Sequence, residues 1–110
     1  MSNHNVYSRS LFSGASVLES DRQVTKGIDV VYYVKHLRHV KIGTTAEIFK
    51  RISHLGCAPS DVLAIEFGSF DLERQRHEQF AHLLEPTLGR EHFRLGPDLK
   101  QHIISLRSAA

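Results

Sequence analysis

The chain has little of several things that would assign a class of protein at once. Among its 110 residues there is one cysteine, Cys57, three prolines and no tryptophan. A single cysteine excludes an intrachain disulfide and a cysteine zinc site, and it suits a reducing compartment, so we expect a cytoplasmic protein. No apolar run approaches the roughly 20 residues that span a bilayer, and no secretory signal pattern is present, so no membrane association is expected.

The chain also has no large excess of positive or negative charge. The 14 lysines and arginines against 12 aspartates and glutamates give a formal net charge of +2. This small basic excess fits a solvated mixed-charge surface as well as a nucleic-acid-binding surface. Hydrophobic residues make up 41% of the chain and charged residues 24%, which predicts a single soluble globular domain.

The sequence divides into two parts. Residues 1–27 are rich in serine and have loosely spaced apolar residues, so we expect an N-terminal arm that is flexible or contains one short helix. Residues 28–110 are expected to form the domain. Its pattern predicts strands at 29–36, 40–43 and 62–67, helices at 45–55, 71–84 and 97–106, and a short extended piece at 92–95. This order predicts an α+β fold in which a three-stranded antiparallel sheet is flanked by helices.

The register of the first two strands decides which polar residues meet. The first strand has apolar residues on both faces, so we expect helices to cover both. If the hairpin pairs His36 with His39, then Val34 pairs with Lys41. Tyr32 then lies on the same face as Lys41, as a diagonal neighbour within reach of its side chain. A lysine there would favour the phenolate form of the tyrosine, whose ordinary pKa is about 10.

Two short strings carry the most specific signal: Val30-Val31-Tyr32-Tyr33-Val34 and Lys41-Ile42-Gly43. Arg51 follows eight residues after Gly43, and Glu73 lies in the second expected helix. In this order and spacing the residues resemble the GIY-YIG nuclease superfamily, in particular a phage-associated branch with Lys-Ile-Gly in place of Tyr-Ile-Gly. The resemblance covers residues 29–93 and implies a small domain that cuts phosphodiester bonds with one metal ion.

The resemblance implies a role for each matched residue. Tyr32 corresponds to the proposed general base that acts on water, and Lys41 would tune it. Arg51 corresponds to the arginine that holds the scissile phosphate, and Glu73 to the glutamate that binds Mg²⁺ or Mn²⁺. His77, four residues after Glu73 on the same helix face, would orient the metal, a water or the leaving group.

These residue types suit phosphoryl chemistry. Mg²⁺ prefers oxygen ligands and often takes one carboxylate together with waters and substrate phosphate, so a single glutamate suffices in principle. An arginine fork can hold a phosphate through two parallel hydrogen bonds. The plain alternatives stay open: Tyr32 as a core aromatic, Lys41 and Arg51 as surface cations, and Glu73 and His77 as a solvated helix face.

Four further residues are candidates for contact with nucleic acid. Lys35 and Arg38 lie in the expected hairpin, where basic side chains would contact phosphates. Gly43 would end its strand in a phosphate-facing turn. Glu91 would replace an asparagine that many superfamily members use and that this chain lacks after Asn5. The simpler alternatives are hairpin solubility, a turn glycine and a strand-edge glutamate.

Three functions stay open on this reasoning. The first is a Mg²⁺- or Mn²⁺-dependent DNA endonuclease, with RNA also possible as a substrate. The second is a nucleic-acid-binding module of the same fold without catalysis, because the second tyrosine and the asparagine are both missing. The third is a protein-interaction domain. Since no second domain reads base sequence, we expect low intrinsic specificity or a protein partner that supplies it.

Overall fold

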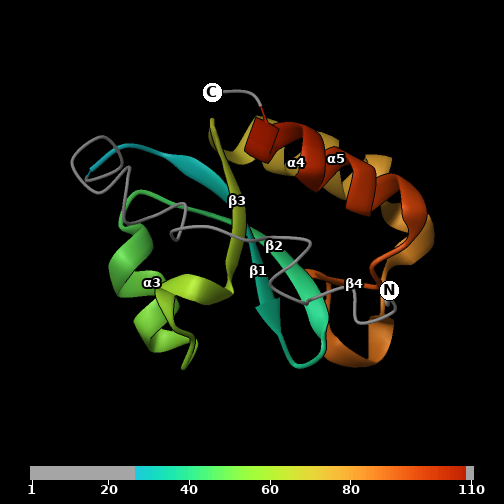
Figure 1. The fold of residues 1–110 in the computed structure, drawn as a ribbon, viewed down its shortest axis with the longest axis horizontal. Coiled ribbons are helices and arrows are strands. Elements are labelled where there is room, and N and C mark those ends of the chain that lie inside the picture. The colour runs from blue at the N-terminus through green and yellow to red at the C-terminus, as the bar shows by residue number, and fades with distance from the viewer. Residues whose placement is uncertain (1–26, 109–110) are drawn as a thin grey trace.

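The structure is a computed structural model that describes residues 27–108, so the expected arm at 1–27 lies outside the described residues apart from Gly27. Within the described part, a helix, an antiparallel sheet and two further helices form three layers (Figure 1). The four strands of the sheet lie in the order β3-β1-β2-β4. They are β1 (Val30–His36), β2 (His39–Thr45), β3 (Val62–Phe67) and β4 (His92–Phe93).

The α+β class and the antiparallel sheet are confirmed, but the expected number of three strands is wrong. The short extended piece near residue 92 is a fourth strand, because β4 pairs with Val40 and Lys41 of β2. It ends at Phe93, earlier than expected. A two-residue strand carries little pattern of its own, and only its partner makes it part of a sheet.

The hairpin between β1 and β2 has the expected register, with His36 paired to His39 and Val34 paired to Lys41. Its two turn residues, Leu37 and Arg38, have φ angles of 54° and 64°. Positive φ at both central residues is the geometry of the two-residue turn that matches the twist of a hairpin. Strand pairing therefore imposes this turn although neither residue is a glycine or an asparagine.

Each face of β1 is buried beneath a different layer, as the apolar residues on both faces predict. Helix α3 (Ile48–His54) covers one face and helix α5 (Pro97–Ser108) the other (Figure 1). We call these the α3 face and the α5 face. The α3 face is a cluster of Val30, Tyr32, Val34, Ile48, Ile52 and Val62. The α5 face includes Val31, Tyr33, Val40, Ile42, Phe80, Phe93, Leu99 and Ile103.

The helices differ from the predictions mainly at their ends. α3 begins at Ile48 rather than 45, because Thr45 Oγ1 accepts the N–H of Glu47 (3.0 Å) in a turn before the helix. Helix α4 (Phe70–Gln79) begins after Ser69 and ends well before residue 84. The chain turns at Phe80, which is 1% exposed, and continues as a short 3-10 helix, Ala81–Leu83.

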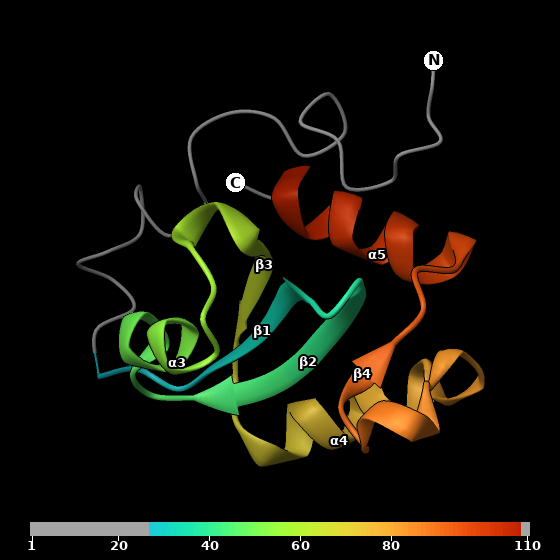
Figure 2. The same ribbon diagram turned by 90° about the horizontal axis from the view of Figure 1, so that it is seen from below.

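The place of α4 matters most for the site. It lies beside β2, next to β4 (Figure 2). His77 Nε2 lies 2.8 Å from the carbonyl oxygen of Ile42, a β2 residue just past the last one paired with β4. None of the helices in residues 27–108 is long and apolar enough to cross a membrane.

Candidate functional site

Tyr32 lies at the base of the candidate site, on the α3 face and with no exposed surface. Arg51 Nη1 donates a hydrogen bond to its hydroxyl oxygen (3.3 Å). Burial raises the pKa of Tyr32 by more than the hydrogen bond from Arg51 and the positive charges of Lys41 and Arg51 lower it. Lys41 therefore acts in the expected direction, but burial outweighs it, and Tyr32 is a neutral phenol at pH 7.

Gly43 makes room for this tyrosine. It lies inside β2, which continues to Thr45, and it pairs directly with Tyr32. The expectation that Gly43 ends its strand in a turn is therefore wrong. A Cβ at position 43 would lie under 3.0 Å from both the hydroxyl oxygen and Cζ of Tyr32. Any side chain larger than hydrogen would collide with a buried ring, which explains the glycine by packing.

Lys41 and Glu91 form an ion pair beside the tyrosine. Lys41 Nζ lies 2.6 Å from Glu91 Oε1, and their side chains are 15% and 39% exposed. The backbone holds this arrangement, because the N–H of Ile42 donates to the carbonyl oxygen of Glu91 (2.8 Å). Glu91 thus offsets the charge of Lys41, a role that its predicted contact with nucleic acid did not include.

His77 fixes the helix that carries Glu73. A carbonyl oxygen only accepts, so His77 Nε2 donates its proton to Ile42, and in the neutral ring Nδ1 is left as an acceptor. The ring also packs on Phe93, with 5.2 Å between the ring centroids. Glu73 lies one helical turn earlier and is partly buried. His77 therefore sets the position of Glu73 along the open edge of β2.

The electrostatics of Glu73 show that the expected residues come together. Burial raises the pKa of its carboxyl group, and the negative charge of Glu91 raises it further. The charges of His77, Lys41 and Arg51 lower it by less in total, so the net shift is upward. These neighbours belong to α4, β2, α3 and the segment before β4. The fold thus gathers groups that are far apart in the chain, and we call this the Glu73 cluster.

Of the Glu73 cluster, Glu73 itself fits a divalent cation best. Its raised pKa means that negative charge is unfavourable there, and a bound cation would relieve this. Among residues 27–108, no group of three or more histidine, cysteine, aspartate or glutamate side chains could hold a metal ion. A cation at Glu73 would therefore complete its coordination with water and substrate phosphate, which suits Mg²⁺ or Mn²⁺ better than Zn²⁺.

Two predicted contact residues lie apart from this cluster. Lys35 pairs with Val40, a residue of the α5 face, so strand alternation turns Lys35 away from the face of Tyr32. Arg38 is an exposed residue of the hairpin turn. Contact of either residue with nucleic acid stays a prediction, and it would be made outside the Glu73 cluster.

Sequence reasoning missed a histidine pair beside Lys41. His36 Nδ1 lies 2.9 Å from His92 Nε2, and His92 is only 6% exposed. Burial and the nearby charge of Lys41 lower the pKa of His92, which keeps the ring neutral at pH 7. The histidines looked scattered in the sequence. The pairing of β4 with β2 was the missing signal, because it places His92 directly opposite Lys41.

Sequence reasoning also missed a polar network on the α5 face. The hydroxyl of Tyr33 donates to Glu66 and lies 3.0 Å from His102 Nε2. Arg76 donates to both oxygens of Glu66, through Nε (3.0 Å) and Nη2 (2.7 Å). Burial raises the pKa of Glu66, but hydrogen bonds from His102, Arg76 and Tyr33 outweigh it and bring the pKa to about 2. Each of these partners is supplied by a different part of the chain.

Comparisons of the chain with protein-family models, with curated proteins and with solved structures find no match.

Proposed function

We propose that the protein is a metal-dependent endonuclease that hydrolyses phosphodiester bonds in DNA, with a site of the GIY-YIG kind. One observation carries this proposal: residues matched by sequence alone gather at one edge of the sheet. Arg51 bonds to the hydroxyl of Tyr32, and the charges of Lys41, Arg51 and His77 all act on Glu73. Coincidental core residues have no reason to converge on one half-buried carboxylate.

In this proposal the protein positions a phosphate and balances its charge. Arg51 holds the scissile phosphate and stabilises the charge that grows on it, while Tyr32 orients Arg51 from below. Lys41, held in place by Glu91, adds positive charge, and His77 orients the attacking water through Nδ1. Glu73 would hold Mg²⁺ or Mn²⁺, which supplies Lewis-acid stabilisation of the phosphate. Burial keeps Tyr32 protonated, so its part is to orient groups and not to remove a proton.

The proposal is tested by incubating the protein with supercoiled plasmid DNA, with Mg²⁺, with Mn²⁺ or with a chelator. Wild-type protein is expected to nick the plasmid only with metal. Glu73→Ala and Arg51→Ala should lower the rate by at least about 10²-fold, because each removes a group that stabilises the transition-state charge. Circular dichroism should show that both variants keep the fold.

The matched control is Glu78→Ala, which removes an exposed carboxylate from the same helix. It should nick at the wild-type rate. Nicking by Glu73→Ala and Arg51→Ala at that same rate would show that the assigned site is not the site of cleavage.

One observation favours a second function, a nucleic-acid-binding module without catalysis. The phenol of Tyr32 is buried and its pKa is raised, and a lysine paired with a glutamate occupies the place of the second tyrosine. This function predicts DNA binding that weakens with salt, needs no metal and produces no nicking. The plasmid assay and a salt titration together separate the two functions.

A further inference from the structure

Phe70 is unusually exposed to solvent for a phenylalanine. Its side chain opens α4 and is 69% exposed, more than that of Ile28, Leu37 or Phe67, the other exposed large hydrophobic residues of the described part. Exposure of so much apolar surface to water is unfavourable. A single exposed phenylalanine needs no explanation by itself, so its neighbours decide whether it has a function.

The position of Phe70 on α4 puts it in line with the Glu73 cluster. Glu73 follows Phe70 by three residues, and side chains at this spacing are neighbours on one helix face. His77 follows by seven residues, or about two turns, and so lies almost directly below Phe70 on the helix. Because His77 donates to the Ile42 carbonyl of β2, this helix face is the one that turns towards the site.

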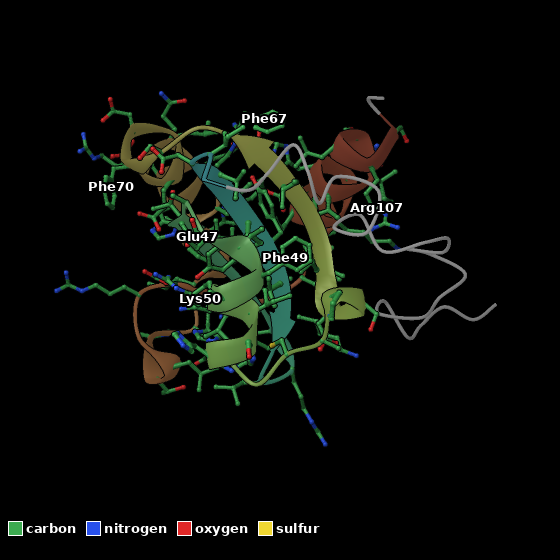
Figure 3. All side chains as sticks on the ribbon, turned by 90° about the vertical axis from the view of Figure 1, so that its left-hand side faces the viewer. Glu47, Phe49, Lys50, Phe67, Phe70 and Arg107 are labelled. Carbon is green, nitrogen blue, oxygen red and sulfur yellow. The ribbon has the colours of Figure 1, made fainter. Side chains whose placement is uncertain are left out.

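Two exposed basic side chains lie in this part of the molecule, one on α3 and one on α4. Figure 3 shows Phe70 on the side of α3 where Glu47 and Lys50 lie, and Phe49 and Arg107 on the other side. Lys50 is exposed and directly precedes Arg51, which belongs to the Glu73 cluster. Arg74 lies one helical turn after Phe70; its side chain is 70% exposed, and its Nη2 lies 3.8 Å from Oδ1 of Asp71. An exposed aromatic ring near cationic side chains is a combination that binds single-stranded nucleic acid, since the cations attract phosphates and the ring stacks on a base.

We propose that Phe70 is a base-stacking platform next to the scissile phosphate, and that the substrate is therefore single-stranded or locally unpaired nucleic acid. A base inside a duplex has neighbours against both of its faces and offers neither to the protein. An unpaired base offers a face to the ring of Phe70 while its phosphate reaches Arg51 and the cation that Glu73 would hold. This inference rests on the proposed function for the presence of a nucleic acid and adds which form is bound.

The absence of tryptophan from the chain provides a direct test. A Phe70→Trp variant carries the only indole of the protein, and its fluorescence reports on position 70 alone. An unlabelled 20-nucleotide oligothymidine at low salt should quench this emission to saturation, because the indole stacks on a base. Phe67→Trp is the matched control, as Phe67 is 60% exposed but lies on β3, the edge strand farthest from β4. Its emission should change little.

Affinity provides the second measurement, made in the Glu73→Gln background so that no DNA is cut. Phe70→Ala should weaken binding of the single strand by roughly 5- to 150-fold, the usual loss for one stacked base. Binding of the matching 20-base-pair duplex should change by less than about twofold, since its bases are already stacked. Phe67→Ala should leave both affinities within about twofold.

Three results would overturn the inference. The first is that Phe70→Ala weakens binding of single strand and duplex equally. The second is that the emission of Phe70→Trp is not quenched although DNA binds. The third is that this emission is blue-shifted before DNA is added, which would mean that protein covers position 70. Failure of the proposed function differs from all three. Quenching and loss of affinity without any plasmid nicking would keep the stacking platform and reject the endonuclease, whereas nicking without an effect at Phe70 would do the reverse.

Discussion

Tyr32 and Tyr33 are adjacent in the sequence, and neither has any exposed surface, yet their hydroxyls lie in opposite surroundings. On the α5 face, the hydroxyl of Tyr33 belongs to a network in which Glu66 accepts hydrogen bonds from the tyrosine and from Nε and Nη2 of Arg76. On the α3 face, the hydroxyl of Tyr32 accepts one longer hydrogen bond from Arg51. On the α5 face the polar groups thus hydrogen-bond to one another, whereas on the α3 face they lie next to a partly exposed edge.

One glutamate on each side shows what the difference means: Glu66 bonds to Tyr33, and Glu73 shares the neighbouring charges of Lys41 and Arg51 with Tyr32. The pKa of Glu66 is about 2, so its carboxylate is better stabilised in the folded protein than in water. The pKa of Glu73 is raised, so its carboxylate is less stable than in water. A polar network that serves the fold is satisfied, whereas a site that binds a ligand keeps an unfavourable charge for that ligand to relieve.

The largest expected effect is the loss of stability in Glu66→Gln. A pKa of about 2 against an ordinary value of 4.5 corresponds to about 3 kcal/mol of unfolding free energy at pH 7. The folded-state pKa is below the unfolded one, so this contribution is complete above about pH 4.5 and is lost as the pH falls towards 2. Urea unfolding at pH 7, 4 and 2.5 should show the gap between wild type and variant closing towards acid.

Glu73→Gln is the contrasting variant. Its folded-state pKa is raised, so the wild-type carboxylate lowers stability once the pH rises through that value. The variant should therefore be slightly more stable than wild type at pH 7, and this gain should vanish below the ordinary carboxyl pKa. If Glu73→Gln destabilised the protein as much as Glu66→Gln, Glu73 would be a structural residue and the contrast between the two faces would be lost.

Sequence reasoning worked where local pattern decides the structure. The dense Val and Tyr of β1, the hairpin register and the bounds of β3 are confirmed, because alternation and strand pairing depend on residues close in sequence. The pairing of Val34 with Lys41 followed from this register, and it put Lys41 on the face of Tyr32. This short-range geometry is why Lys41 of the Glu73 cluster could be placed in advance.

The rest depends on contacts between distant parts of the chain. The network around Tyr33 takes Glu66, Arg76 and His102 from three different elements, and their spacing along the sequence does not predict it. The short extended piece at 92–95 was expected, but its place in the sheet was not, since two residues form a strand only when a partner is present. The sign of the pKa shift of Tyr32 depends on burial, and charge spacing in the sequence does not report burial.

The next largest effect should come from Gly43→Ala. The added methyl group would collide with the ring of Tyr32, and overpacking of this kind costs about 1–3 kcal/mol. The displaced hydroxyl should also lose its hydrogen bond from Arg51, so nicking should slow. The comparison of faces gives a control: the same substitution in a Tyr33→Phe background should cost its full amount, whereas in a Tyr32→Leu background it should cost less. Equal costs in both backgrounds would mean that Tyr32 is not the residue that requires a glycine.

The smallest expected effects on stability come from removing each hydroxyl in turn, and they separate the faces most clearly. Tyr33→Phe takes a donor from Glu66, whose side chain is 11% exposed, and should cost about 1.5 kcal/mol, while Tyr32→Phe removes one 3.3 Å hydrogen bond and should cost about 0.5 kcal/mol. Activity should follow the opposite order. Tyr32→Phe loosens Arg51 and should slow nicking, whereas Tyr33→Phe leaves the Glu73 cluster intact and should nick at close to the wild-type rate.

Urea unfolding and plasmid nicking on the same two preparations measure both quantities. If the variant that loses more stability also lost more nicking activity, the two faces would form one structural unit. Only a separate site allows the variant with the smaller loss of stability to have the larger loss of activity.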